Sequence, residues 1–256
     1  MHQSALFSEP MVVEDPHECR FYHSLDLPSF GSVRGQWDLR GRFDDYTGSL
    51  SWSGKSVLDV GTASGFLSFE AERRGARVVS FDIDDAQHIN ALAFANDVRQ
   101  LNRKQWLAEV NTRILSTRKS YWLAHRDYRS RNKACYSNVY DIPSALGVFD
   151  IVLVGQILVH LSDVVRALER AAAHCSRTLV VAEGMIDNDR DAYSCFLADA
   201  GRPDLSSVFW HHSTGFYVRY IGILGFKLRR KSIGTYICNS NPTEPGVITT
   251  LVFDRQ

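Results

Sequence analysis

The chain has 256 residues, of which 45% are apolar and 23% charged, and its formal net charge is zero. This is an ordinary globular composition, long enough to bury one sizeable core, and the charge balance gives no sign of a polyanionic partner for the whole molecule. The five cysteines are scattered and form no Cys-x-x-Cys pair, so neither a zinc site nor a disulfide framework is indicated, and a reducing, cytoplasmic setting is expected.

Residues 1–50 carry prolines, glycines and aromatic residues without a sustained period. We predict an N-terminal extension there, covering a single α/β domain at 51–256. Residues 1–20 lack the pattern of a signal peptide, and the longest apolar stretch, 151–161, is far shorter than the roughly 20 residues that cross a bilayer. We expect no membrane contact.

From residue 56 onward, segments typical of strands and helices alternate. Strands are expected at 56–61, 76–83, 133–139, 149–155 and 177–183, and helices at 66–74, 86–96, 162–174 and 214–224. Two β-rich segments, 227–236 and 247–254, close the chain as an antiparallel hairpin. The order predicts a Rossmann-like α/β fold with seven strands, and the closing hairpin favours a methyltransferase sheet over a dinucleotide-binding one.

The first strand leads into a glycine loop, Asp59-Val60-Gly61-Thr62-Ala63-Ser64-Gly65. Gly61 allows a sharp turn close to a ligand, and Gly65 opens a helix whose free N–H groups face that ligand. The Gly-x-x-x-Gly spacing differs from the Gly-x-Gly-x-x-Gly that binds a pyrophosphate, which S-adenosylmethionine (SAM) lacks. Asp59, Gly61, Thr62, Ala63 and Gly65 are therefore candidate SAM-binding residues.

The second strand ends in Asp82 and Ile83. A carboxylate at this place can accept hydrogen bonds from both ribose hydroxyls, which makes Asp82 and its neighbour candidate cofactor residues. The alternative is that Asp82 only caps the next helix, but Asp84 and Asp85 are better placed for that.

Two later strand ends complete the expected cofactor pocket. Asn138 and Val139 follow the third strand, where an amide could read the adenine edge and Val139 could pack on the ring; Asn138 could equally be an ordinary turn residue. Gly155 and Gln156 end the fourth strand beneath the methionine part of the cofactor.

These motifs carry a family resemblance. Residues 57–65 resemble motif I of class I methyltransferases, and segments 37–40, 138–143, 149–155 and 157–161 resemble the bacterial group related to the tRNA wobble-uridine carboxymethyltransferase. The resemblance implies that Trp37 lies against the methionine end of SAM and that His160 lies on the rim of the active site.

One departure from that group concerns the cofactor. Val159-His160-Leu161 stands where the tRNA enzyme is expected to have Tyr-His-Arg. Leucine cannot reproduce the two-pronged grip of arginine on a carboxylate. We therefore expect plain SAM rather than carboxy-SAM, and methyl rather than carboxymethyl transfer.

Histidines are the candidate general bases, since their pKa lies near neutrality. His160, His211 and His212 are the catalytic candidates, and Trp210 and His23 are candidate substrate contacts. His160 could instead be a core histidine, and the others could be ordinary loop residues.

A metal site would need more than the adjacent pair His211–His212. Glu183 or Asp187 could join them, but the sequence fixes no third ligand at a suitable spacing. We predict no metal.

A basic segment separates the second and third strands. Residues 99–133 hold ten basic side chains against two acidic ones, with aromatic residues interleaved. We predict a helical insert at about 97–132, which is either an arm that meets an anionic partner such as RNA or a pair of amphipathic helices with a solvated basic face.

Three functions are compatible with these features. The first is SAM-dependent methyl transfer to a small molecule of secondary metabolism, a natural product or sugar derivative, at oxygen, carbon or nitrogen. The second is methylation of tRNA, and the third is a non-catalytic SAM-binding protein that contacts a partner. A nicotinamide dehydrogenase is disfavoured, because its glycine spacing is absent and no Tyr-x-x-x-Lys follows the fourth strand.

Overall fold

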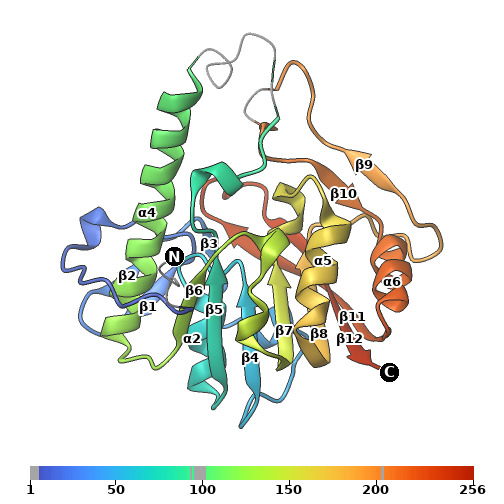
Figure 1. Ribbon diagram of the computed structural model, residues 1–256, viewed down its shortest axis with the longest axis horizontal. Helices are drawn as coiled ribbons and strands as arrows, with labels where there is room; N and C mark the ends of the chain where they lie inside the picture. The colour runs from blue at the N-terminus through green and yellow to red at the C-terminus, as the bar shows by residue number, and fades with distance from the viewer. Residues whose placement is uncertain (1–5, 93, 95–101, 203–204) are drawn as a thin grey trace.

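The computed structural model describes residues 6–92, 94, 102–202 and 205–256. Its central sheet has eight strands in the order β3-β11-β12-β8-β7-β4-β5-β6 (Figure 1). The strands are β3 (Trp37–Asp38), β4 (Ser56–Val60), β5 (Arg77–Asp82), β6 (Lys133–Tyr136), β7 (Phe149–Gly155), β8 (Cys175–Glu183), β11 (Phe226–Cys238) and β12 (Gly246–Arg255). β4 to β8 are parallel, and β12 and β11 pair antiparallel at the far side. The predicted α/β fold with a closing hairpin is confirmed, with the short β3 added at the edge.

Helices cover both faces of the sheet. One apolar core contains buried residues of α1 (Phe43–Thr47), α2 (Phe66–Arg73) and α4 (Arg103–Asp127), and the other contains those of α5 (Val164–Ala173) and α6 (Thr214–Ile223). The central strands read as continuous apolar runs because both of their faces are covered. Short 3-10 turns lie at Pro16–Glu18, Ala86–His88, Val139–Asp141, Ser144–Leu146 and Leu158–His160.

The helix expected at 86–96 is wrong over its described part. Only the turn Ala86–His88 forms there, with Asp85 as its cap, and residues 89–92 form no helix; 93, 95 and 96 lie outside the described residues. Tertiary contacts outweigh helix propensity, because the Asn90 side-chain oxygen accepts hydrogen bonds from Tyr140 Oη and Ser162 N. These contacts hold the segment across the end of the sheet.

The basic insert contains one long helix rather than a pair in its described part. α4 runs for 25 residues, and the polypeptide preceding it (95–101) is not described. Its C-terminal half is buried at Tyr121–Ala124, whereas its first turns rise beyond the carboxyl edge of the sheet (Figure 1).

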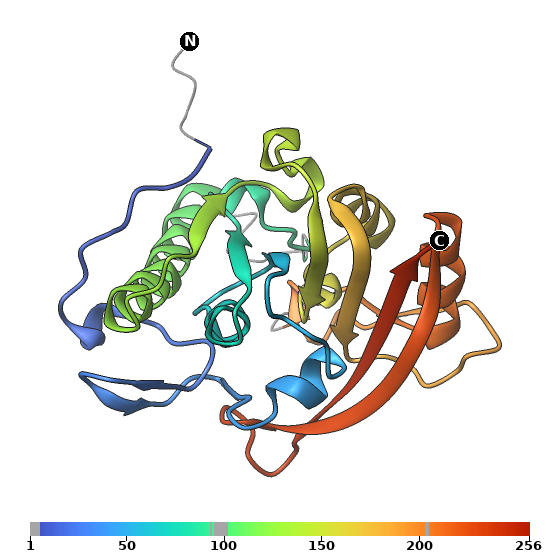
Figure 2. The same ribbon diagram turned by 90° about the horizontal axis from the view of Figure 1, so that it is seen from below.

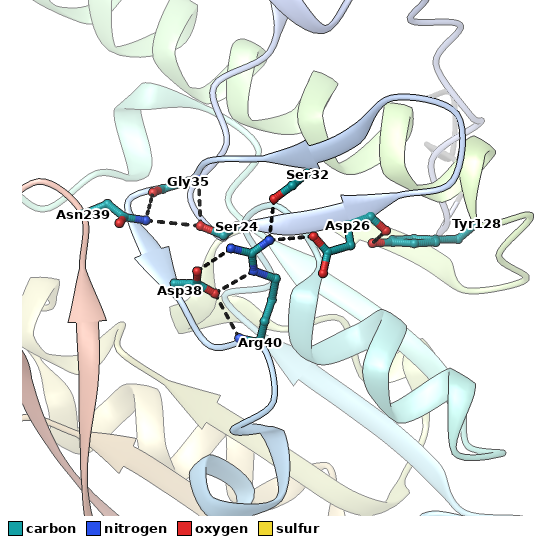
Figure 3. A network of polar contacts seen from close by, with 8 residues as sticks. All are labelled: Ser24, Asp26, Ser32, Gly35, Asp38, Arg40, Tyr128 and Asn239. Carbon is teal, nitrogen blue, oxygen red and sulfur yellow. Dashed lines mark hydrogen bonds and ion pairs between the residues drawn. The ribbon is translucent and has the colours of Figure 1, made fainter.

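The N-terminal extension runs along α4 and then reaches the C-terminal hairpin (Figure 2). It contains the hairpin of β1 (Leu25–Leu27) and β2 (Gly31–Val33). Arg40 binds Asp38 through Nε at 2.8 Å and Asp26 through Nη1 at 2.6 Å (Figure 3). On the other side, Asn239 donates to the Gly35 carbonyl at 2.8 Å. The Arg40 contacts thus hold the β1–β2 hairpin against β3 within the extension, and the Asn239 contact joins the extension to the residues that follow β11.

A second small hairpin pairs β9 (Ser194–Phe196) with β10 (Trp210–His212) and was not expected as strands. No helix in the described ranges combines the length and the apolar character needed to cross a bilayer.

Candidate active site

The glycine loop turns sharply between β4 and α2. Gly61 has φ 87° and Gly65 has φ 86°, conformations that favour glycine. A Cβ on Gly61 would lie 2.2 Å from Cγ2 of Ile157, so the loop also passes too close to the β7 end for any side chain. The N–H groups of Gly61 and Thr62 both donate to the Phe81 carbonyl, which fixes the loop onto β5.

Asp59 and Thr62 lie beneath the loop and not in a cavity. Ser68 Oγ donates to the Asp59 carboxylate at 2.7 Å and lies 3.0 Å from Thr62 Oγ1 and 2.7 Å from Ser80 Oγ. Burial raises the pKa of Asp59 to about 6, although the Ser68 and Thr62 hydrogen bonds lower it. These two predicted cofactor residues therefore hold the loop in shape from below.

Asp82 lies at the end of β5, level with the loop. Its Oδ2 accepts a hydrogen bond from Ala63 N and its Oδ1 one from Ile83 N, each at 2.7 Å. Burial raises its pKa, while these two donors act to lower it. Each carboxylate oxygen can accept more than one hydrogen bond, so capacity remains for two hydroxyls.

A cavity of about 330 Å³ opens beside Asp82, which we call the strand-end cavity. Its walls are largely apolar and include Gly61, Asp82, Ile83, His88, Asn90, Ser137, Val139, Ile157, His160 and Leu161. Small-molecule sites of about 300–1,000 Å³ commonly combine such apolar walls with a few polar groups. Flat aliphatic walls next to a carboxylate suit a purine joined to a ribose, so the residues present fit the adenosine part of SAM.

Asn138, Gly155 and Gln156 lie near this cavity without being among its lining residues. Asn138 accepts a hydrogen bond from Tyr140 N and caps the turn that follows β6, which is the turn-residue alternative. Gly155 is close to Tyr46, whose hydroxyl would lie 2.9 Å from an added Cβ. Gln156 has φ 55° and donates from its N–H to the Ala182 carbonyl.

His160 reaches the strand-end cavity. Its Nδ1 lies 2.6 Å from the Ser207 carbonyl oxygen. Because a carbonyl only accepts, Nδ1 carries the proton, and in the neutral ring Nε2 has a free lone pair. Desolvation lowers the pKa of His160 below its usual value, which keeps the ring neutral at pH 7.

His211, His212 and Trp210 lie together on β10. His212 is buried, stacks on Phe216 at 4.2 Å between ring centroids and has Nδ1 2.6 Å from Ser194 Oγ. Burial lowers its pKa to about 4. His211 Nε2 would lie 3.3 Å from a Cβ on Gly184 just after β8, and Trp210 donates from Nε1 to the Ser162 carbonyl. Of these three, His211 alone is directed toward a strand end.

His23 and Trp37 form a parallel backbone bridge within the N-terminal extension. His23 is buried, and burial lowers its pKa to about 3. The Trp37 ring lies against Gly246, where an added Cβ would be 2.3 Å from it. The Trp37 ring thus contacts the C-terminal hairpin, while its backbone bonds to residues 22–24 of the extension.

Several lining residues had no sequence signal. Ile89 and Asn90 fall inside the segment expected to be helical, and Ser207 lies in a loop without a motif. Ile157 could have been found, because it directly follows the fourth strand end. Within the described ranges, no three His, Cys, Asp or Glu side chains gather as ligands of a metal ion would.

No protein-family model matches the chain, and no curated protein matches it closely in sequence. Solved structures do resemble it. Magnesium protoporphyrin IX methyltransferase from Synechocystis with bound S-adenosylhomocysteine (SAH) has 14% identity and a TM-score of 0.54, over 84% of this chain and 82% of that one. The 1,6-didemethyltoxoflavin-N1-methyltransferase of Burkholderia thailandensis has 12% identity and a TM-score of 0.52, over 85% and 78%.

A SAM-dependent methyltransferase from Mesorhizobium loti matches along its whole length. It has 14% identity and a TM-score of 0.52, over 85% of this chain and 100% of that one. At such identities the likeness concerns the fold. The chain has the fold of class I methyltransferases.

Proposed function

We propose that the protein is a SAM-dependent methyltransferase that acts on a small-molecule acceptor. The observation that carries the proposal is the carboxylate of Asp82, which accepts from the glycine loop at Ala63 and borders an apolar cavity. In doubly wound sheets, ligands bind at this edge, beyond the carboxyl ends of the strands. Two of the similar structures are named for methylation of a porphyrin and of a toxoflavin precursor, which supports a small acceptor.

In this proposal, Asp82 accepts hydrogen bonds from the ribose, and Ile83 and Val139 pack on the adenine. SAM supplies a methyl group bound to a positively charged sulfur. His160 Nε2 takes the proton of an acceptor hydroxyl, while Ser207 holds the ring through Nδ1.

The test is calorimetric titration of the protein with SAH and, separately, with NAD+. We expect saturable binding of SAH and none of NAD+. Binding of NAD+ in place of SAH would overturn the proposal. SAH binding with no release of SAH from SAM on any acceptor would favour the non-catalytic alternative.

We further propose that the cofactor is unmodified SAM. Leu161 is an apolar wall of the strand-end cavity at the position where the tRNA wobble-uridine group is expected to have arginine. An apolar wall disfavours an extra carboxylate, because the desolvated anion would lack a partner. Competition between SAM and carboxy-SAM in the same calorimeter tests this, and a preference for carboxy-SAM would contradict it.

A further inference from the structure

A second cavity of about 290 Å³ adjoins the first. Both cavities are lined by Asp82, Ile83, Ile89 and Ser207, so they share one wall. The second lies between the first half of α4 and the N-terminal extension, and we call it the α4 cavity. Figure 1 shows this half of α4 standing beyond the carboxyl edge of the sheet.

The α4 cavity is rich in guanidinium groups. Arg20, Arg113 and Arg118 line it, and Asp82 is the only carboxylate among its described lining residues. Both oxygens of Asp82 already accept backbone hydrogen bonds. The lining therefore carries an excess of positive charge.

Arg118 has a structural role in this wall. Its Nη2 donates to the carbonyls of Ile83 and Asp84 at 3.0 Å, and its guanidinium lies 3.9 Å from the ring centroid of Tyr136. Its buried Nε has no hydrogen-bond partner among the described residues. The guanidinium of Arg118 is thus held in place, and its Nε–H is a donor without a partner among the described residues.

Arg20 and Arg113 differ from Arg118, because within the described ranges neither guanidinium has a hydrogen bond or an ion pair, whereas that of Arg118 is bonded to two backbone carbonyls. Arg113 shares its helix face with Trp106, Val110 and Thr117, which also line the cavity. Their spacing of three or four residues puts them on one side of α4. Two uncommitted guanidinium groups beside a ring are a suitable receptor for a planar anion, since arginine binds carboxylates through two parallel hydrogen bonds.

We infer that the α4 cavity binds the anionic group of the methyl acceptor, and that the acceptor is a small, flat acid. The inference rests on the proposed function. SAM itself has a sulfonium and an ammonium against a single carboxylate, so its net charge is positive and an arginine-rich cavity disfavours it. We assign Arg113 to the acceptor, so that a methionine carboxylate reaching this cavity would be left with Arg20.

The size of the cavity favours a small molecule over RNA. About 290 Å³ holds one or two rings, and the three arginines line this space between α4 and the extension, with Arg118 half-buried and Arg20 and Arg113 exposed. Phosphate-backbone binding would instead use an extended outer surface, such as Arg103 and Lys104 at the exposed start of α4. Those two side chains do not line the α4 cavity.

The experiment measures binding of benzoate, 4-hydroxybenzoate and 6-hydroxy-2-naphthoate, each beside its methyl ester, to the SAH-saturated protein. We expect at least one acid to bind about tenfold more tightly than its ester, the scale of a charge-assisted bidentate contact. Arg113→Met should abolish that preference and change SAH affinity by less than about twofold. Arg103→Met, a cation on the same helix outside the cavity, should change neither.

Three results would overturn the inference. Equal binding of acid and ester, or no binding of any of the acids, removes the anion subsite. A loss of SAH affinity in Arg113→Met assigns the guanidinium to the cofactor carboxylate. Displacement of the bound acid by tRNA, weakened equally by Arg113→Met and Arg103→Met, assigns the surface to RNA. Failure of SAH to bind the unaltered protein would instead contradict the proposed function.

Discussion

The carboxylate of Asp82 accepts a hydrogen bond from the backbone N–H of Ala63 at 2.7 Å, and so links the end of β5 to the glycine loop. The same carboxylate borders both cavities. One side chain thereby shapes the loop and presents oxygen acceptors where a ribose is expected. The structure thus holds the proposed cofactor site in place before any ligand binds, which reduces the entropy lost on binding.

Replacing this carboxylate tests its proposed contact with the ribose. Asp82→Asn keeps the shape but loses an acceptor and the negative charge, so we expect SAH affinity to fall by about tenfold to a hundredfold, with net hydrogen-bond energies of about 1.5–3 kcal/mol. Calorimetric titration with SAH measures the affinity of this variant. Asp85→Asn is the matched control, because asparagine caps the turn at Ala86–His88 as well as aspartate does. Equal SAH affinity in both variants would contradict the role of Asp82.

Gly61 is required for two separable reasons, its positive φ and its closeness to Ile157. Gly61→Ala should lower the free energy of unfolding by more than Gly54→Ala, since Gly54 has φ 73° but no atom within 4 Å of an added Cβ. The backbone strain common to both is about 1–2 kcal/mol. Urea unfolding of both variants measures the difference.

The excess cost in Gly61→Ala should disappear when the clashing side chain is removed. In a double-mutant cycle with Ile157→Ala, we expect a coupling free energy of about 1 kcal/mol or more, favourable in the double variant. Additive effects of the two substitutions would mean that the loop, and not Ile157, relieves the contact.

The glycine loop and the strand order could be predicted from sequence because both depend on local signals. Gly61 and Gly65 are the residues that a positive φ favours, and buried parallel strands appear as apolar runs. The boundaries agree closely: the strand expected at 149–155 is β7, with the same limits. The closing hairpin could be predicted because the sequence shows no helical segment between its two β-rich segments.

Other features depend on contacts that sequence does not reveal. Residues 89–92 are not helical, and Asn90 instead binds Tyr140 and Ser162, which lie 50 and 72 positions away. The roles of Asp59 and Arg113 likewise depend on tertiary packing, because it decides what the side of β4 with Asp59 and the side of α4 with Arg113 contact. Asp59 lies under the loop and Arg113 lies over a cavity, although both belong to segments that the sequence identified.

His160 is the proposed base, so the rate of methyl transfer should depend on pH. The neutral ring is the active form and its pKa lies below 6.5, so the rate with a hydroxyl acceptor should be constant near pH 7 and fall at lower pH. His160→Asn retains a donor for the Ser207 carbonyl but has no basic nitrogen. We expect a loss of about 10²–10⁴ in turnover, much larger than any change in SAH affinity from the altered cavity wall.

The matched control is His211→Asn. This variant should keep the turnover rate of the unaltered protein and the same fall in rate at low pH. The rate of SAH release from SAM, followed between pH 5 and 8 with any acceptor that supports turnover, measures both variants. A rate lost in His211→Asn and kept in His160→Asn would move the base to β10.

Glu183 offers a test that needs no ligand. Its Oε1 accepts from Leu158 N at 2.8 Å, while its buried Oε2 has no partner among the described residues. Burial raises its pKa from 4.5 to about 8, although the backbone N–H groups of the turn at Leu158–His160 act to lower it. The fold therefore favours the neutral acid, and Glu183 contributes stability that is complete below pH 4.5 and is lost as pH rises toward 8.

Glu183→Gln keeps the acceptor for Leu158 and removes the ionisation. We expect the variant to match the unaltered protein near pH 4 and to be more stable above it, with the gap in unfolding free energy growing by up to about 1.4 kcal/mol per pH unit until pH 8. Urea unfolding at pH 4.5, 6 and 8 measures the slope. Glu244→Gln, which replaces an exposed carboxylate in the turn between β11 and β12, is the control and is measured at the same three pH values. A constant gap across the range would mean that Glu183 is ionised in the folded protein, with its second oxygen stabilised by a group that the contacts around it do not reveal.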